Sequence, residues 1–278
     1  MIAEQEPRDG AATPSPLAPD LLPRRRPIRR AADALPAAAL TAALLLVWQT
    51  ATGLGGLPKW LLPSPLDIAA ALVTSAPLLA FHAARTLEEA LIGLLFAFAL
   101  GVGTAIVMDR SEFARRAFYP ILVTSQTIPI VAIAPLLVIW FGYDLLPKVL
   151  VVGLVCFFPM VVATFDGLGA VDPEAVRLVR SMGATGWQLF WRVRWPGALP
   201  SVFSGVRISV TYGVVGAIVG EFVGASRGLG YYLQHSADQL LTERVFAGIV
   251  VSAVLSVALF LVVGLIERLL VPWHRPER

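Results

Sequence analysis

Long apolar runs constrain this chain more than any other feature of its sequence. They lie at roughly 34–52, 87–108, 119–140, 147–165, 205–225 and 246–270. Each is close to the ~20 residues that a helix needs to cross the hydrocarbon core of a bilayer. Only 15% of the 278 residues are charged, whereas a soluble domain carries about 25%. Because an open sheet edge cannot be satisfied in lipid, the sequence predicts an all-α membrane protein with about six transmembrane helices.

The segment 58–84 is apolar but interrupted. Ser64 and Asp67, close to two prolines, are typical of a helix start. Pro77 and His82 then break the apolar pattern that follows. We therefore predict that this segment forms a helix lying at the outer surface of the membrane.

The two chain ends differ from the transmembrane domain, which we place between residues 34 and 273. Residues 1–33 are rich in proline and arginine, and this composition predicts a disordered tail. A cleaved signal peptide is the competing interpretation, but no clear small-x-small cleavage site follows the run 34–52, and further spans come after it. We expect a retained first span and a second short tail at 274–278.

The distribution of basic residues predicts how the spans are oriented. With the N-terminus in the cytoplasm and six spans, 17 of the 22 basic residues fall on the cytoplasmic side. The positive-inside rule favours this arrangement. It places both termini, and the tails that precede and follow the spans, in the cytoplasm, together with a long loop at about 166–204.

Two spans carry small residues at four-residue spacing, which lets helix backbones approach closely in a bilayer. The stripes consist of Gly93, Ala97, Gly101 and Ala105, and of Gly216, Gly220, Gly224 and Gly228. Packing within one subunit and contact between two subunits both explain such stripes.

No residues for ATP hydrolysis or metal chemistry can be identified. The only two lysines, Lys59 and Lys148, each follow a proline, so the chain has no G-x-x-x-x-G-K-[ST] phosphate loop. A single cysteine excludes a thiolate metal cluster, and the three histidines are far apart and expected at the surface. A net charge of +3 gives no reason to expect nucleic acid binding. We predict no cofactor, no metal and no enzymatic activity, so ATP-driven work would come through a partner.

The loop at about 166–204 contains its own helix signals. Asp172 is a favourable N-cap, Pro173 suits the first helical position, and Glu174 complements the positive end of a helix. Gly183 can take the left-handed conformation that ends a helix. These residues predict one short helix between Asp172 and Gly183.

A second helix is expected directly after that glycine. Thr185 and Gln188 have the spacing of a capping box, and Pro196 is expected to end the helix. The pair would present apolar and basic side chains together, namely Val179, Met182, Leu189 and Val193 with Arg177, Arg180, Arg192 and Arg194. An interfacial helix pair under anionic lipid headgroups is the competing interpretation.

This loop resembles the cytoplasmic "EAA" loop of bacterial ABC importer permeases, EAA-x3-G-x9-I-x-LP. Gly183 and Pro196 stand at the family's glycine and proline, while the EAA triplet falls on Arg177–Val179 and lacks the family's glutamate. The resemblance extends from about Leu61 to Trp273. It includes LLPSP, SQTIPIVAIAPLLVIWFG and GEFVGASRGLGYYL.

The resemblance implies the type I ABC importer permease fold in a bacterial inner membrane, with the loop docked on a separate ABC ATPase. The coupling residues would be Glu174, Arg177, Arg180, Gly183, Ala184, Thr185, Trp187 and Pro196. The implied partners are ATPase subunits, an external binding protein and a second permease copy or close relative. The closest resemblance is to permeases for the pyrimidine precursor of thiamine, although riboflavin, taurine, sulfonate and nitrate importers share the frame.

Polar residues within spans suggest where a solute passes. Ser125 and Gln126 precede Pro129 in the third span, where prolines bend the helix beside protein or water. Glu221 is the only acid well inside an apolar stretch away from the loops, and is therefore a candidate for gating or solute contact. Interhelical hydrogen bonding and simple access to water are the respective alternatives. The turn 141–143 would face an external binding protein.

A nucleotide-independent secondary transporter or channel is the alternative function. It would need inverted repeats or a chain of intramembrane charges, and neither can be identified in this sequence. Copurification with an ATPase would separate the two functions.

Overall fold

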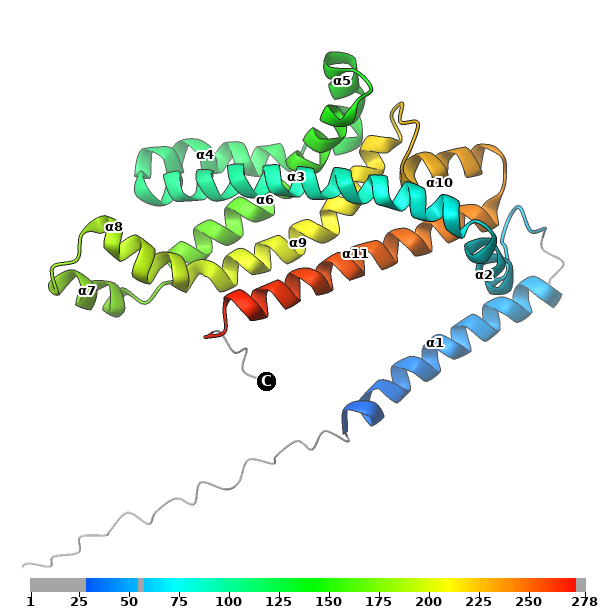
Figure 1. Cartoon of the computed structure of the whole chain (residues 1–278), viewed down its shortest axis with the longest axis horizontal. Helices are drawn as coiled ribbons and strands as arrows, with labels where there is room; N and C mark the ends of the chain where they lie inside the picture. The colour runs from blue at the N-terminus through cyan, green and yellow to red at the C-terminus, as the bar shows by residue number, and fades with distance from the viewer. Residues whose placement is uncertain (1–28, 55–57, 274–278) are drawn as a thin grey trace, which may run out of the picture. The chain divides into compact units, whose positions relative to one another are not determined.

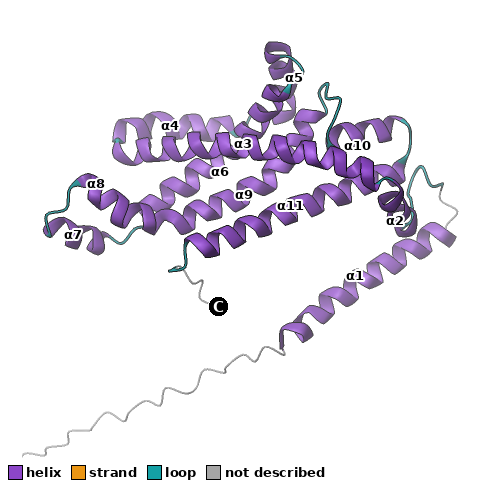
Figure 2. Cartoon of the chain, in the orientation of Figure 1, coloured by secondary structure: helices purple, strands orange, loops and turns teal. Residues whose placement is uncertain are grey.

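The computed structural model describes residues 29–54 and 58–273, and all regular structure within these ranges is helical (Figure 2). Two compact units, 1–47 and 48–278, divide the chain. The predicted tails at 1–33 and 274–278 lie almost wholly outside the described residues. The helix α1 (Arg29–Leu54) begins at Arg29, and its apolar part, Leu35–Gly53, is long enough to cross a membrane.

Within the described ranges, five helices are long and apolar enough to span a bilayer, or six if a bent pair counts as one span. Besides α1 these are α3 (Ala76–Arg110), α6 (Leu145–Gly169), the continuous segment Gly186–Glu221 that ends in α9 (Trp195–Glu221), and α11 (Thr242–Leu270). The bent pair is α4 (Glu112–Ser125) with α5 (Ile130–Phe141), at 100° to each other. The predicted all-α membrane protein with about six spans is confirmed.

The helices α3, α6 and α9 pack together as the centre of the second unit, and α11 lies against α9 (Figure 1). The small-residue stripes allow this packing. A Cβ at Gly101 would lie 2.9 Å from Met160 Cβ on α6, and a Cβ at Gly216 would lie 3.4 Å from Val152 Cα on the same helix. Both stripes therefore bring helices of one subunit together, and the intrasubunit interpretation accounts for these two glycines.

The segment 58–84 differs from its prediction. The short helix α2 (Pro65–Thr74) is capped by Ser64 and Asp67 as expected, but α3 begins only two residues after α2 ends and runs unbroken to Arg110. Pro77 lies in the first turn of α3, where its missing N–H breaks no helical hydrogen bond. The predicted interruption of the helix at Pro77 and His82 is therefore wrong.

A further short helix, α10 (Leu229–Asp238), packs against α9, α3 and α11. The local sequence GLGYYL does not by itself predict this helix. The N-terminus of α10 lies beside a buried polar cluster that includes His82, Thr86 and Glu221.

Candidate coupling loop and buried polar cluster

The first loop helix, α7 (Pro173–Ser181), has the predicted ends. The Asp172 side chain accepts a hydrogen bond from the Glu174 N–H at 2.8 Å. At the other end Gly183 has φ of +83° and its N–H donates to Arg180 O at 3.0 Å, while the Ala184 N–H donates to Val179 O at 3.4 Å. This pair of bonds is a Schellman motif, which needs a residue at positive φ.

The second loop helix, α8 (Gly186–Leu189), begins with the predicted capping box. The Gln188 N–H donates to Thr185 Oγ1 at 3.3 Å, and the Thr185 N–H donates to Gln188 Oε1 at 2.9 Å. The two helices are therefore joined by a glycine turn whose backbone groups are paired on both sides.

The prediction that Pro196 ends this helix is wrong. A π-helical turn at Phe190–Arg194 follows α8, and Pro196 is the second residue of α9, so that α8, the π turn and α9 run on as one apolar segment. The Trp195 N–H donates to Phe190 O, five residues back. This wider turn directly precedes the proline, which supplies no N–H of its own. The loop proper is consequently shorter than 166–204, because α6 extends to Gly169.

The exposed face of the two loop helices is apolar and basic. The side chains of Leu178, Met182 and Trp187 are each more than 60% exposed. Arg177 and Arg180 are exposed too, and neither forms an ion pair with any residue in the described ranges. Of the four apolar residues predicted on this face, only Met182 is exposed; Leu189 is buried and the two valines are half-buried.

Two of the predicted solute-pathway residues lie together. Ser125 and Gln126 line a cavity of about 480 Å³ at the break between α4 and α5, with Pro129 and Phe157 among its other lining residues. The Ser125 hydroxyl donates to Leu122 O of its own helix at 2.8 Å, so this bond is not the interhelical hydrogen bond of the alternative interpretation. The Gln126 side chain is exposed and has no hydrogen bond within the described residues.

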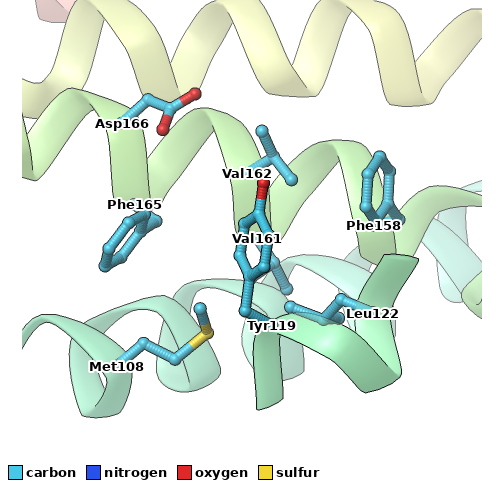
Figure 3. A pocket seen from close by; sticks show the side chains of 8 residues that line it. All are labelled: Met108, Tyr119, Leu122, Phe158, Val161, Val162, Phe165 and Asp166. Atoms are coloured by element: carbon cyan, nitrogen blue, oxygen red, sulfur yellow. The ribbon is translucent and has the colours of Figure 1, made fainter. Parts of the chain in front are cut away.

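A second cavity of about 120 Å³ lies between α3, α4 and α6 (Figure 3). Its lining is apolar except for Tyr119 and Asp166, which come from α4 and α6. Sequence reasoning missed this cavity, because its residues are scattered over three helices and form no local motif.

Glu221 does not line the cavity at the α4–α5 break. Its side chain is 1% exposed, so the expectation that it simply reaches water is wrong. Its Oε1 accepts a hydrogen bond from Thr86 Oγ1 at 2.7 Å, and its Oε2 accepts from the Gly230 N–H at 2.5 Å. Thr86 Oγ1 in turn accepts from the Leu229 N–H at 2.8 Å. The carboxylate therefore stands at the N-terminus of α10, where negative charge is favoured.

The glycines of the GLG motif allow this close approach. Gly228 has φ of +113°, and a Cβ there would overlap the Glu221 carboxylate, while a Cβ at Gly230 would lie 2.5 Å from Ile218 O. The Gly228 N–H donates to His82 Nδ1 at 3.0 Å. His82 is 5% exposed, so placing all histidines at the surface was wrong. His235 is exposed, and His274 lies outside the described residues.

Glu89 also belongs to this buried polar cluster, and it was not predicted from the sequence. Its side chain is fully buried on α3, where its Oε1 accepts from Arg85 Nε at 3.0 Å and lies 3.9 Å from Lys148 Nζ. The four-residue spacing of Arg85 and Glu89 was the available signal for an ion pair. Glu221 is thus not the only acid within the apolar region.

Membrane-spanning helices, a loop of two capped helices with an exposed apolar and basic face, and a span broken beside a mostly apolar cavity are together typical of a transport permease subunit. The family model described as "Binding-protein-dependent transport system inner membrane component" matches residues 93–272, and the chain belongs to that family. It is a permease component of the ABC importer class. The recognition made from the EAA-like loop is confirmed.

Relatives with named transport functions align with most of the chain. The formylaminopyrimidine transport permease protein ThiX of Halalkalibacterium halodurans is 38% identical over 235 residues, which are 84% of this chain and 94% of ThiX. The taurine transport system permease protein TauC of Escherichia coli is 33% identical over 240 residues, 84% of this chain and 87% of TauC.

Solved structures support the fold. The MetNI methionine ABC transporter in its inward-facing conformation aligns with a TM-score of 0.59 at 18% identity, over 71% of this chain and 98% of the transporter chain. An amino acid ABC transporter aligns with a TM-score of 0.55 at 16% identity, over 74% of this chain and 98% of that chain. The predicted type I importer permease fold is confirmed.

Proposed function

We propose that this chain carries a small solute, delivered by an external binding protein, across the bacterial inner membrane with energy from ATPase subunits in separate chains. The observation that carries the proposal is the α7–α8 loop. It combines paired backbone ends, a left-handed glycine and an exposed apolar face, which together suit a rigid element that transmits displacement. The loop faces the cytoplasm in this proposal, as do both termini.

The ATPase cleft that receives the loop is expected to be apolar and acidic. Leu178, Met182 and Trp187 offer apolar anchors, and Trp in particular is favoured at the centre of binding surfaces. Arg177 stands where the family has a glutamate, and neither it nor Arg180 has a partner among the described residues. Complementary charge across an interface therefore requires acids on the ATPase side.

The solute proposed is a formylaminopyrimidine-like precursor of thiamine. Identity to ThiX supports this class of solute, and the broken span supplies a plausible route. A pyrimidine carries ring nitrogens and amino groups, which the Gln126 amide and the Ser125 hydroxyl can match as donors and acceptors. The cavity at the α4–α5 break is large enough for a small heterocycle. Glu221, being fully hydrogen-bonded and buried, is assigned to holding α10 rather than to solute contact.

The proposed assembly contains two permeases, identical or closely related, around one pathway, with two ATPases and a binding protein. The helices α4 and α5 expose large apolar side chains such as Ile139 and Trp140. Because the cavity that holds Ser125 and Gln126 opens beside them, a second permease facing this side would enclose the route.

The docking role is tested by placing a charge on the apolar face of the loop. Met182→Glu leaves the fold intact, because Met182 is 78% exposed, and it should abolish copurification of the ATPase. Val73→Glu is the matched control, since Val73 is 77% exposed on α2, and it should leave copurification unchanged. If the Met182→Glu variant copurified with as much ATPase as the wild type, the loop would serve only as a lipid-facing helix pair.

A further inference from the structure

One ion pair joins the loop to the helices that cross the membrane. Arg194, the last residue of the π turn, makes a bidentate contact with Asp109 of α3, with Nη1–Oδ2 at 2.6 Å and Nη2–Oδ1 at 2.7 Å. The same Nη2 donates to Leu168 O of α6 at 3.0 Å. The Asp109 side chain is only 9% exposed, so solvent screens this pair less than it screens a surface pair.

The pair lies where two helices end. Asp109 is the penultimate residue of α3, and Leu168 is the penultimate residue of α6. The C-terminal end of a helix carries partial negative charge, so a carboxylate there is unfavourable without a cation. The guanidinium of Arg194 neutralises Asp109 and satisfies a terminal carbonyl of α6. Both helix ends therefore contact one side chain of the π turn that follows α8.

Apolar contacts surround the pair and fix its position. Phe190 of the π turn is 5% exposed and packs with Leu168 and Ala198. The guanidinium of Arg110, the last residue of α3, lies over the Phe190 ring at 5.1 Å. A π turn inside a continuous helix is a frequent feature of functional positions. Here it brings Phe190 and Arg194 to the ends of α3 and α6.

We propose that the Asp109–Arg194 pair is the joint through which displacement of α7 and α8 enters α3 and α6, and that both are positioning residues for transport. This inference rests on the proposed coupling function of the loop. The segment that carries Arg194 continues through α9 to Glu221, which is bonded to Thr86 of α3. Hydrogen bonds thus connect α3 to the Arg194–Glu221 segment at both ends of that segment, so a displacement at Arg194 moves α3 and α9 together.

If the Asp109–Arg194 pair only stabilised the fold, removing a comparable ion pair elsewhere would affect transport equally. A second ion pair therefore serves as the control. Arg207 of α9 contacts Glu267 of α11 at 2.6 Å, with side chains 31% and 16% exposed. This pair is as short and nearly as sheltered as Asp109–Arg194, but it joins α9 to α11 and involves neither α3 nor the loop. Glu267→Gln therefore matches Asp109→Asn in chemistry without touching the joint.

The experiment uses the complete complex in proteoliposomes and compares wild type with Asp109→Asn, Arg194→Lys and Glu267→Gln. Membrane abundance, ATPase copurification, binding-protein-stimulated ATP hydrolysis and solute uptake are measured on each. We expect Asp109→Asn to keep abundance and ATPase copurification and to lower uptake per ATP hydrolysed about tenfold, a typical size for coupling between sites. Arg194→Lys should lower it as well, because lysine cannot make the bidentate contact. Glu267→Gln should leave the ratio unchanged.

A charge swap guards against a folding defect. If Asp109→Asn does not accumulate, the double variant Asp109→Arg with Arg194→Asp should restore both abundance and part of the uptake ratio. Wild-type uptake per ATP in Asp109→Asn and Arg194→Lys would overturn the inference, and so would an equal loss in Glu267→Gln. Loss of ATPase copurification in Asp109→Asn would also overturn it, because the pair would then only shape the docking face. The proposed function fails separately, if Met182→Glu still captures the ATPase.

Discussion

Replacing Gly183 by valine tests the conformation on which the loop depends. Gly183 has φ of +83°, a region that a β-branched residue strongly disfavours. No heavy atom lies within 4 Å of a Cβ added there, so the cost is backbone strain alone. Strain of this kind costs about 1–3 kcal/mol, which lowers the population of the correctly turned loop about 5- to 150-fold.

The strain should unfold only the turn. No residue of α7 is buried, so the helix can rearrange without disturbing the packing of α3, α6 and α9. We therefore expect Gly183→Val to reach the membrane at normal abundance while ATPase copurification and solute uptake fall at least fivefold. The assay measures those three quantities on one preparation.

Gly142→Val is the matched control for ATPase copurification. Gly142 also has φ of +83° and also has no neighbour within 4 Å of an added Cβ, but it lies in the turn between α5 and α6. The Gly142→Val variant should copurify with the ATPase as the wild type does. Normal capture and normal uptake by Gly183→Val at normal abundance would refute the reasoning.

Three further predictions concern other parts of the molecule. Glu221→Ala leaves the Gly230 N–H without an acceptor, at about 1–3 kcal/mol, and leaves the Thr86 hydroxyl only the His82 carbonyl at 3.2 Å, so detergent-solubilised protein should unfold at a clearly lower temperature than Glu221→Gln; equal melting would contradict the network. Gln126→Ala should raise the KM for solute with little change in ATPase copurification, and an unchanged KM would remove Gln126 from the pathway. Single cysteines at Ser181 and Asp238 should react with an impermeant reagent on intact cells only at the second position, and equal labelling would refute the orientation.

The sequence predicted best those features that are set by neighbouring residues. The caps of α7 and α8 depend on Asp172, Gly183 and Thr185, each of which acts within four residues, and all three are as expected. The apolar runs likewise predicted the spans, because lipid leaves the backbone few alternatives. Helix ends were less well predicted, since Pro77 lies in the first turn of α3 and Pro196 directly follows a π turn, and at neither place does the proline end a helix.

The buried polar contacts could not be predicted because they join residues far apart in the chain. Thr86 and Glu221 are 135 positions apart, and Asp109 and Arg194 are 85 apart. Nothing in the local pattern around His82 distinguishes a buried acceptor for a backbone N–H from a surface residue. Tertiary packing decides these contacts, and it also decides that Leu189 faces the core while Met182 faces outward.

The most direct test of the central claim is solute uptake by proteoliposomes that contain the permease, its ATPase and the solute-loaded binding protein. The proposed function predicts accumulation of a labelled formylaminopyrimidine against its gradient only when ATP is present on the ATPase side. Accumulation should stop when ATP is replaced by a non-hydrolysable analogue. Equal uptake without ATP, or with the permease alone, would contradict ATP-driven import and would favour a nucleotide-independent transporter.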